Sequence, residues 1–494
     1  LAAIEKGLKL RCALKIVAEE FENEMRQLDN EFMRERLADM KDVILRIYQA
    51  AERLAGGEQD EGGRRKTRRR GKPVIVAREL LPSQLIRIPL ANLAGIVCEH
   101  GGTTTHVAIL AKALQIPMIV GLKDLTKQVR QNDNLLMDCS TGCCFVRPTA
   151  SVLRRFKPAL LHYKRKDGYE PIETCKLAVT KDNVPIRLGG NVSLVSELPL
   201  LERYGAMGVG LYRTEFMFMI RAAYPSEDEQ YNVFRRIVEA SSESSVTIRV
   251  LDVGGDKPLP YVNFGPEDNP FLGWRGVRFL LSNPQYLQPH LRAILRTTVH
   301  GKVNILFPMV ADLEELLLLK EALEAARRSL DDDGVEYRAA FRVGIMLEVP
   351  SAVWNLREML PHVDFVSIGT NDLIQYMFAV DRGNSKVTKW FRQFHPVVLR
   401  ILKEICDIVG EYPGKAVSVC GEVAGMTLGI PLLLGVGLRH LSMNPWKIPP
   451  VRSAICKISM EECNKLAATA LKAQSDDEIV RLIEEFAEDN NLRE

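Results

Sequence analysis

The chain has 494 residues, of which 46% are hydrophobic and 26% charged, and its formal net charge is +3. This length and composition are typical of a soluble globular protein with two or three domains. The small net charge argues against a general attraction to nucleic acid or to anionic membranes. No apolar run reaches the roughly 18 residues that a membrane-spanning helix needs.

No secretory signal is visible, and the ten cysteines are spread along the chain apart from Cys139, Cys143 and Cys144. This cluster has no nearby histidine and no second CxxC pair, so a zinc site is not expected. We therefore expect reduced thiols in a cytoplasmic protein.

Residues 1–55 are rich in Glu, Lys, Leu and Ala, with apolar residues at helical spacing. They predict one or two long amphipathic helices that end at Gly56 and Gly57. Because the chain begins with Leu1 inside this pattern, we expect a longer protein whose beginning is absent. Residues 56–72 form a low-complexity segment that contains the basic run RRKTRRR. Since it lacks aromatic residues to stack on bases, we interpret it as a flexible basic linker rather than a nucleic-acid tether.

Residues 73–150 combine short apolar segments with one helical segment, which predicts a compact α/β domain. The predicted helix begins directly after His106, and residues 151–180 are expected to form a linker helix. The strands of this domain are predicted at residues 73–81, 93–99 and 116–122, with a hairpin at residues 134–148.

From residue 181 to residue 494, short apolar strands alternate with helical patterns, which predicts a (β/α)8 TIM barrel. The eight strands are predicted at residues 184–192, 208–216, 246–255, 303–310, 342–350, 365–372, 416–425 and 438–444.

Polar side chains stand near the C-terminal ends of these strands, where barrel enzymes carry their functional groups. Several arginines lie in this region, and their guanidinium groups match the geometry of phosphate and carboxylate groups. Surface ion pairs are the alternative for each arginine taken alone. The polar residues at or near the strand ends are Arg213, Arg249, Arg275, Glu348, Asn371, Asp372, Arg382 and Cys420.

Two of these side chains, Glu348 and Asp372, offer hard carboxylate oxygens that hold Mg²⁺ together with substrate oxygens. Their alternative role is helix capping. Cys420 ends a strand next to Gly421. A thiol among arginines and a metal can exchange a proton with a carbanion or an enolate, whereas a buried inert thiol is the common alternative.

His106 closes the segment EHGGTTTH at the start of a predicted helix. Backbone N–H groups and the helix dipole favour negative charge there, and Gly101 and Gly102 allow a tight turn. The dipole also disfavours imidazolium, which keeps the ring neutral and nucleophilic. A capping or packing histidine is the alternative. The barrel rim favours a phosphate acceptor.

Six segments carry a family resemblance. They read GGTTTHVAILAKAL, LYRTEFMFM, LDVGGDKPLPY, NPFLGWRGVR, IGTNDLIQY and CGEVAG. Together, in this order and over nearly the whole chain, they resemble enzyme I of the bacterial phosphotransferase system, a family of phosphoenolpyruvate-utilising enzymes. The resemblance implies an α/β multi-domain protein. Its parts are a swivelling phosphohistidine domain at residues 73–150, a partial helical carrier-docking domain at residues 1–55 and a barrel at residues 181–494 that binds phosphoenolpyruvate and dimerises.

The resemblance also implies the roles of individual residues. His106 is implied to be phosphorylated and Cys420 to protonate the enolate, while Glu348 and Asp372 are implied to bind Mg²⁺. The residues implied to bind phosphoenolpyruvate are Arg213, Arg249, Arg275, Asn371, Asp372 and Arg382.

The implied function is transfer of the phosphoryl group of phosphoenolpyruvate to His106 and then to a histidine of a small HPr-like phosphocarrier protein, with release of pyruvate. This reaction is the first step of the phosphotransferase system. For the histidine to serve two sites, the connections at residues 56–72 and 151–180 are expected to be flexible. We expect a homodimer formed through the barrel, with no nucleic-acid or membrane partner.

The chain departs from the family pattern at several points. The family's first strand and helices are missing before Leu1, Met426 stands where an aspartate is common, and Thr103 stands where some members carry arginine. These departures motivate one alternative, a regulatory relative that binds phosphoenolpyruvate without turnover. A second alternative is a dikinase-type enzyme, although no GxxxxGK[ST] nucleotide loop is present.

Overall fold

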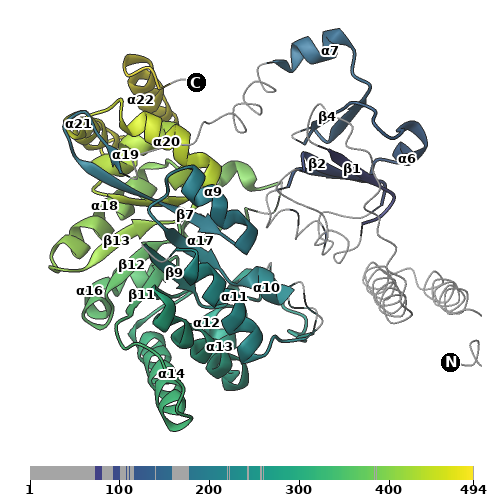
Figure 1. Ribbon diagram of the computed structural model, residues 1–494. Helices are drawn as coiled ribbons and strands as arrows, with labels where there is room; N and C mark the ends of the chain where they lie inside the picture. Colours follow the sequence, from purple (N-terminus) through teal and green to yellow (C-terminus); the bar gives the residue numbers. More distant parts are fainter. Residues whose placement is uncertain are drawn as a thin grey trace, which may run out of the picture. The chain divides into compact units, whose positions relative to one another are not determined.

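The computed structural model describes residues 73–80, 93–100, 107, 111, 116–139, 141–157, 177–219, 221, 223–241, 244–255, 257, 259, 261–382, 384 and 386–492 (Figure 1). The helices predicted for residues 1–55, the run RRKTRRR and His106 lie outside these residues. The chain divides into two compact units, Leu1–Leu160 and Leu161–Glu494. In the part that the structure describes, no helix has the length and apolar character needed to cross a bilayer.

The first unit contains a parallel sheet with the strand order β1-β2-β3 and a separate antiparallel hairpin of β4 and β5. Val97, Ile119 and Leu125 form its buried centre. All of the strands predicted between residues 73 and 148 are confirmed. Their bounds, with those of two short helices, are β1 Val74–Ala77, β2 Gly95–Cys98, β3 Met118–Val120, α6 Leu125–Gln128, β4 Leu135–Asp138, β5 Cys143–Val146 and α7 Ala150–Arg155.

Two predicted helices of this unit are only partly described. Of the helix expected after His106, Val107 and Ala111 are described, and both are helical and buried. Of the linker helix expected at residues 151–180, α7 forms the beginning, where the side chain of Thr149 caps the helix by accepting a hydrogen bond from the Val152 N–H.

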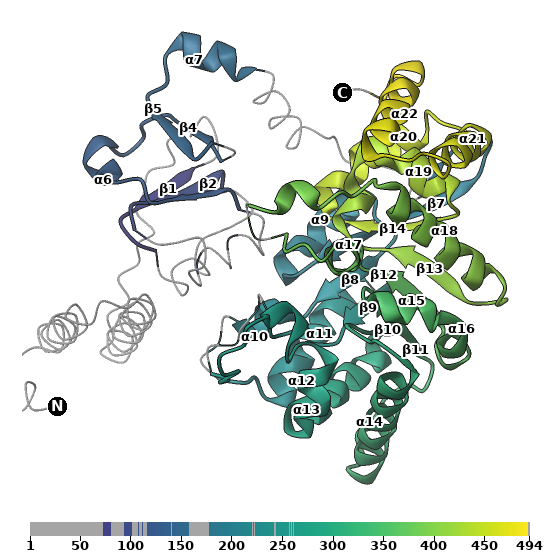
Figure 2. The same cartoon turned by 180° about the vertical axis from the view of Figure 1, so that it is seen from behind.

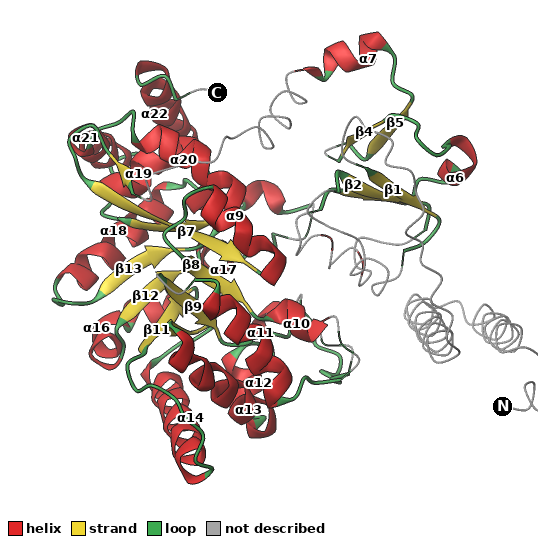
Figure 3. Ribbon diagram, in the orientation of Figure 1, coloured by secondary structure: helices red, strands yellow, loops and turns green. Residues whose placement is uncertain are grey.

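The second unit is a closed barrel of eight parallel strands in the order β7 to β14, with β14 paired to β7. Figure 3 shows these strands at the centre with helices around them. The predicted (β/α)8 barrel is thereby confirmed. A short strand, β6, pairs antiparallel with β7. The strand bounds are β6 Ala178–Val179, β7 Pro185–Val192, β8 Val209–Arg213, β9 Ser245–Arg249, β10 Lys302–Phe307, β11 Arg342–Leu347, β12 Phe365–Ile368, β13 Ala416–Val419 and β14 His440–Met443.

Helices cover the outside of the barrel, as the view from behind in Figure 2 also shows. The longest of those described is α14, which begins at a cap where the Asp312 side chain accepts from the Glu315 N–H. It buries Leu316, Leu319 and Leu323, whose spacing places them on one face. The helix bounds are α9 Leu198–Arg203, α10 Glu215–Met219, α11 Glu227–Glu239, α12 Val277–Leu281, α13 Pro284–Arg296, α14 Leu313–Asp332, α15 Pro350–Trp354, α16 Leu356–Met359, α17 Thr370–Phe378, α18 Pro396–Gly410, α19 Ile430–Gly435, α20 Ile448–Ile455, α21 Met460–Ala470 and α22 Asp476–Asp489.

The strands are apolar because both of their faces are covered. Every residue of β12, Phe365–Ile368, is buried, and most of β10 and β11 is buried as well. Strands enclosed in this way read as continuous runs of Val, Ile, Leu and Phe rather than as alternating patterns. The first polar side chains after such a run therefore lie at the carboxyl rim of the barrel.

Candidate active site

The carboxyl rim brings together polar residues that were predicted at or near the ends of the barrel strands. Arg213 is the last residue of β8 and Arg249 the last of β9. Glu348 follows β11, and Cys420 follows β13. Asn371 and Asp372 lie in the first turn of α17, directly after β12. Parallel strands end on the same side of a barrel, so these side chains share one rim.

Arg249 and Arg213 form the cationic part of this rim. Arg249 is buried, and its Nη2 lies 2.7 Å from Glu215 Oε1, with Nη1 3.5 Å from Asp252 Oδ2. Burial would lower the pKa of Arg249, but Glu215 and Asp252 raise it above its usual value. Its Nε has no hydrogen-bond partner among the described residues. One donor of this guanidinium is therefore buried and unpaired among the described residues.

Arg213 is half-buried and forms no ion pair or hydrogen bond with any residue that the structure describes. Burial, followed by the nearby positive charge of Arg249, lowers the pKa of Arg213. A guanidinium in this environment is stabilised by an added negative charge. The two arginines together thus fit an anion such as a phosphate.

Arg275 is fully buried, and carboxylates already occupy its donors. Its Nε and Nη2 lie 3.0 and 3.1 Å from the two oxygens of Asp252, and its Nη1 lies 3.0 Å from Asp372 Oδ1. Gly276 comes next at φ 59, in the left-handed region that glycine adopts without strain. Arg275 thereby ties the loop after β9 to the first turn of α17.

Arg382 approaches the same carboxylate from the other side. Its Nη2 lies 4.0 Å from Asp372 Oδ2, and its main-chain N–H donates to Gln375 Oε1 at 3.1 Å. Burial would raise the pKa of Asp372, but Arg275 and Arg382 hold it below the usual value. Asp372 is therefore ionised. It is not the N-cap of α17, because that position belongs to Gly369.

Glu348 is the second carboxylate of the predicted cation site. Its Oε1 accepts a hydrogen bond of 2.7 Å from the N–H of Met309, a residue at φ 56, which is rare for a side chain of this kind. Burial, with Asp372 and Asp252 nearby, raises the pKa of Glu348 to about 7. Among the described residues, no cationic side chain lies within ion-pair distance of it.

These two carboxylates fit a divalent cation that is also held by oxygens of a ligand. Within the described ranges, no group of three or more His, Cys, Asp or Glu side chains is placed to hold a metal by itself. Mg²⁺ commonly keeps waters and substrate oxygens as ligands and uses only one or two protein carboxylates. An added cation would also relieve the repulsion that raises the pKa of Glu348.

Asn371 forms hydrogen bonds with the loop after β13 rather than with another of the predicted rim residues. Its Oδ1 accepts from the Glu422 N–H at 3.1 Å, and its Nδ2 donates to Glu422 Oε1 at 3.4 Å. This loop begins at Cys420, so Asn371 connects the start of α17 with the predicted proton donor.

Cys420 is buried, with 3% of its surface exposed, and its Sγ lies 3.6 Å from the Ile368 carbonyl oxygen. Burial raises the pKa of this thiol. It therefore keeps its proton at neutral pH, which suits an acid better than a nucleophile. Leu211, Leu306 and Met346 pack around it inside the barrel.

Two acidic residues of this site were missed at the level of sequence. Glu215 pairs with Arg249, and Asp252 binds Arg275 and Lys257. Burial would raise the pKa of Asp252, but Arg275, Lys257 and Arg249 hold it well below the usual value. Both acids stand within the motifs LYRTEF and LDVGGDK, so their proximity to the arginines was the available signal.

In the first unit, Glu99 follows β2 in the segment that leads to His106. Its Oε1 accepts hydrogen bonds from the N–H and the Oγ1 of Thr126, both at 2.6 Å, and these bonds lower the pKa of Glu99. This carboxylate joins the end of β2 to the start of α6. His106 itself lies outside the described residues, so its predicted role stays a prediction.

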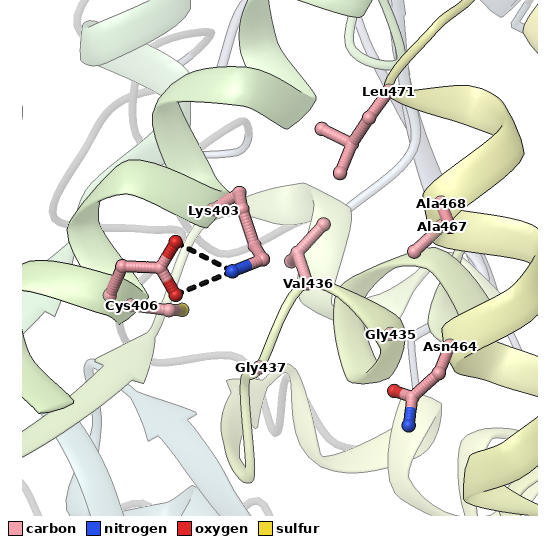
Figure 4. Close-up of a pocket in the computed structure, with 10 residues that line it drawn as sticks. Lys403, Cys406, Gly435, Val436, Gly437, Asn464, Ala467, Ala468 and Leu471 are labelled. Atoms are coloured by element: carbon pink, nitrogen blue, oxygen red, sulfur yellow. Dashed lines mark hydrogen bonds and ion pairs between the residues drawn. The ribbon is translucent and has the colours of Figure 1, made fainter.

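A cavity of about 420 Å³ lies elsewhere on the barrel, between α18, α21 and the turn that leads into β14 (Figure 4). An ion pair between Lys403 and Asp407, 2.5 Å long, stands at its wall. Gly437 precedes the amino end of β14, so the cavity is at the end of the strand opposite to the rim. None of the predicted site residues lines it.

Comparisons with known proteins match a large part of each compact unit to a family. The family model of the PEP-binding domain of PEP-utilising enzymes matches residues 170–460, and that of their mobile domain matches residues 70–142.

Three phosphoenolpyruvate-protein phosphotransferases are similar over most of their length. The protein of Haemophilus influenzae is 36% identical over 474 residues, which are 94% of this chain and 80% of the relative. That of Staphylococcus carnosus is 36% identical over 481 residues, 96% of this chain and 81% of the relative. That of Buchnera aphidicola is 34% identical over 493 residues, 99% of this chain and 83% of the relative. With these similarities and this rim, the chain belongs to the PEP-utilising enzymes, in the family of the phosphoenolpyruvate-protein phosphotransferases.

Proposed function

We propose that this enzyme transfers the phosphoryl group of phosphoenolpyruvate to its own His106 and then to a histidine of a small HPr-like phosphocarrier, releasing pyruvate. One observation carries the proposal. Arg213 forms no ion pair or hydrogen bond with any described residue, and it pairs in register with Arg249, whose Nε is also unpaired, on a rim that also holds Glu348. Such a rim suits a small molecule that carries several negative charges and can also coordinate a bound cation.

The chemistry follows from these positions. Arg213 and Arg249 hold the phosphoryl group and stabilise its charge during transfer. The P–O bond of phosphoenolpyruvate breaks as a P–N bond to the His106 imidazole forms, and the organic product leaves as an enolate. Cys420 then gives its thiol proton to the methylene carbon, and its thiolate takes a proton from water. The product is pyruvate.

Glu348 and Asp372 are the residues that would hold the cation, which we propose is Mg²⁺. When bound, it supplies positive charge to the oxygens of the phosphoryl and carboxylate groups. Arg275 and Arg382 keep Asp372 ionised and oriented for this role. We also propose that the enzyme is a cytoplasmic homodimer that associates through the barrel, and that residues 73–150 and 181–494 are separate domains.

The experiment that tests the proposal uses phosphoenolpyruvate labelled in its phosphoryl group, with Mg²⁺. The intact chain is expected to take up acid-labile label, because phosphohistidine is hydrolysed by acid. His106→Ala should take up none, whereas His100→Ala, changed in the same segment, should be labelled like the parent. Removal of Mg²⁺ with a chelator should also stop labelling. Label on His106→Ala would refute the proposal.

Labelling, pyruvate release and exchange of phosphate with ATP together separate the two alternatives. A regulatory relative without turnover would bind phosphoenolpyruvate but release no pyruvate and take up no label. A dikinase-type enzyme would exchange phosphate with ATP, whereas the proposed enzyme is expected to show no exchange.

A further inference from the structure

The pairing between β13 and β14, next to Cys420, is short. β13 and β14 share one registered pair, Val419 with Leu441, whereas β14 and β7 share four. The ladder therefore ends before Cys420. The Cys420 N–H still donates to the Ile368 carbonyl at 3.1 Å, on the β12 side. Its own carbonyl has to find a partner elsewhere, because a buried carbonyl without one is costly.

That partner is a side chain from a strand two positions away. Asn191 on β7 is buried, and its Nδ2 donates to the Cys420 carbonyl at 2.9 Å and to the Ser442 carbonyl at 3.4 Å. The Ser442 hydroxyl donates to Asn191 Oδ1 at 2.6 Å. Both ends of the amide are thus engaged, which fixes its orientation.

Two glycines leave the space in which this pair lies. A Cβ atom added to Gly210 would stand 2.2 Å from the Ser442 hydroxyl oxygen, and one added to Gly189 would stand 3.3 Å from it. Real Cβ contacts are never as short as the first, so β8 admits no side chain at this position. The strands β7, β8 and β14 are thereby shaped around one serine and one asparagine.

We propose that Asn191, oriented by Ser442, is a positioning residue for proton transfer from Cys420. This inference rests on the proposed function. The main chain of Cys420 is held at its N–H from β12 and at its carbonyl from β7, and these two bonds fix the backbone that carries the thiol, whose Sγ lies 3.6 Å from the Ile368 carbonyl oxygen. In the step concerned, the S–H bond breaks and a C–H bond forms at the methylene carbon of the enolate; water then returns a proton to the thiolate. Small displacements of a reacting group cost large factors in rate.

The proposal predicts that proton transfer and ligand binding respond differently to the same change. The readout for proton transfer is exchange of the methyl protons of pyruvate for deuterium in D₂O with Mg²⁺, followed by proton NMR. The readout for binding is the Kd of phosphoenolpyruvate with Mg²⁺, measured by calorimetry. Asn191→Leu should slow the exchange tenfold or more, while the Kd changes less than threefold.

Four further variants make the test decisive. Ser442→Ala leaves the Nδ2 donor in place but removes the bond that orients it, so we expect a smaller loss of two- to fivefold; it also carries the test if Asn191→Leu fails to fold. Asn304→Leu is the matched control, since this β10 side chain also bonds a neighbouring strand, at Thr247, and should leave exchange unchanged. In Cys420→Ala, which should not exchange, adding Asn191→Leu should change nothing more.

The outcomes separate the role of Cys420 as the acid from the role of Asn191 in positioning it. If the parent and Cys420→Ala exchange equally, Cys420 is not the acid and the positioning role fails with it, whereas the proposed phosphoryl transfer is judged separately by the labelling of His106. If Cys420→Ala abolishes exchange but Asn191→Leu and Ser442→Ala exchange like the parent, the positioning role is wrong. It is also wrong if exchange and phosphoenolpyruvate affinity fall by the same factor, because that result indicates a general effect on structure.

Discussion

Buried charge is the main cost of this site, and Asp252 shows how the chain meets it. Its carboxylate contacts Arg275, Lys257 and Arg249, all close to the rim. Each contact offsets the loss of hydration that burial imposes on the partner. Two of the arginines predicted to bind substrate, Arg249 and Arg275, therefore depend on an acid that was not among the predicted ligands.

Asp252→Asn is expected to destabilise the barrel by about 3–5 kcal/mol, because it leaves Arg275 buried without its main counter-charge. Glu411→Gln is the control: it breaks an ion pair with Arg357 in which both side chains are half exposed, and should cost far less because solvent screens this pair. Urea unfolding followed by tryptophan fluorescence measures both, since all four tryptophans lie between residues 274 and 446. Equal losses in the two variants would contradict the argument.

A buried histidine makes the stability of the barrel depend on pH. His290 Nε2 accepts from the Leu251 N–H at 3.1 Å, and its Nδ1 lies 2.7 Å from Gln230 Oε1. The Gln230 amide donates to the Pro225 carbonyl, so Nδ1 carries the ring proton. Burial lowers the pKa of His290 to about 3. A second proton would have to displace the bond from Leu251.

The sign of the pH dependence follows from this shift. The unfolded chain binds the proton below pH about 6.5, whereas the folded chain does not until about pH 3, so stability is lost as pH falls through this interval. The loss from this one group is about 1.4 kcal/mol per pH unit. His290→Gln, which offers a similar donor and acceptor without titrating, should flatten the urea-unfolding free energy between pH 6 and pH 4. An unchanged slope in the variant would show that His290 is not the group responsible.

At the scale of elements, one cross-strand pair between β11 and β12 combines a glycine with a large aromatic ring. Gly344 on β11 stands opposite Phe365 on β12, and a Cβ added to Gly344 would lie 2.6 to 2.7 Å from the aromatic ring. Phe365 in turn packs inside the barrel near Cys420. A glycine is therefore required where this ring crosses the neighbouring strand.

Gly344→Ala should overpack this contact and cost about 1–3 kcal/mol. Phe365→Leu in the same chain should restore part of the loss, because the smaller side chain makes room for the methyl group. Gly410→Ala, at the end of α18, is the control, since nothing lies within 4 Å of a Cβ there. The comparison uses urea unfolding at pH 7. Failure of Phe365→Leu to recover any stability would mean that the ring is not the cause.

At the scale of the molecule, the proposed reaction would be divided between the two compact units. The rim belongs to the second unit, and His106 belongs to the segment Leu1–Leu160. A histidine that collects a phosphoryl group at the rim and delivers it to a carrier has to visit two places. The predicted connection at residues 151–180, of which 158–176 lie outside the described residues, is therefore expected to control delivery rather than binding.

Replacing residues 158–176 by a rigid helical linker of equal length should slow phosphorylation of the carrier more than it weakens phosphoenolpyruvate binding. A Gly/Ser linker of the same length is the control and should leave both nearly unchanged. Rapid-quench kinetics with labelled phosphoenolpyruvate and calorimetry provide the two measurements. Equal effects of the rigid linker on both would argue against a swinging histidine.

Much of the barrel was predictable because its strands are local features. All eight strands were predicted at the correct places, and Arg213, Arg249, Glu348 and Cys420 do stand at or directly after strand ends. A continuous apolar run followed by a polar residue is visible within about ten residues of sequence. The (β/α)8 topology then places all such residues on one rim, without further information.

The contacts that organise the rim were not predictable in this way. Asn191 reads only as one residue of the strand PIRLGGNV, yet it bonds Cys420 across 229 residues of sequence. Arg275, expected as a substrate ligand, already bonds Asp372 across 97 residues. No periodicity or spacing in the sequence indicates which side chains come into contact over such separations.

By itself, therefore, the sequence determined the strands, the barrel and the types of side chain at its rim, because apolar runs and chain order specify these locally. Only the tertiary structure decided which rim guanidinium remains unpaired, which carboxylate has no cationic side chain within ion-pair distance and which amide bonds the Cys420 carbonyl. These properties depend on burial and on pairwise distances, and the closed sheet creates both by joining its first strand to its last.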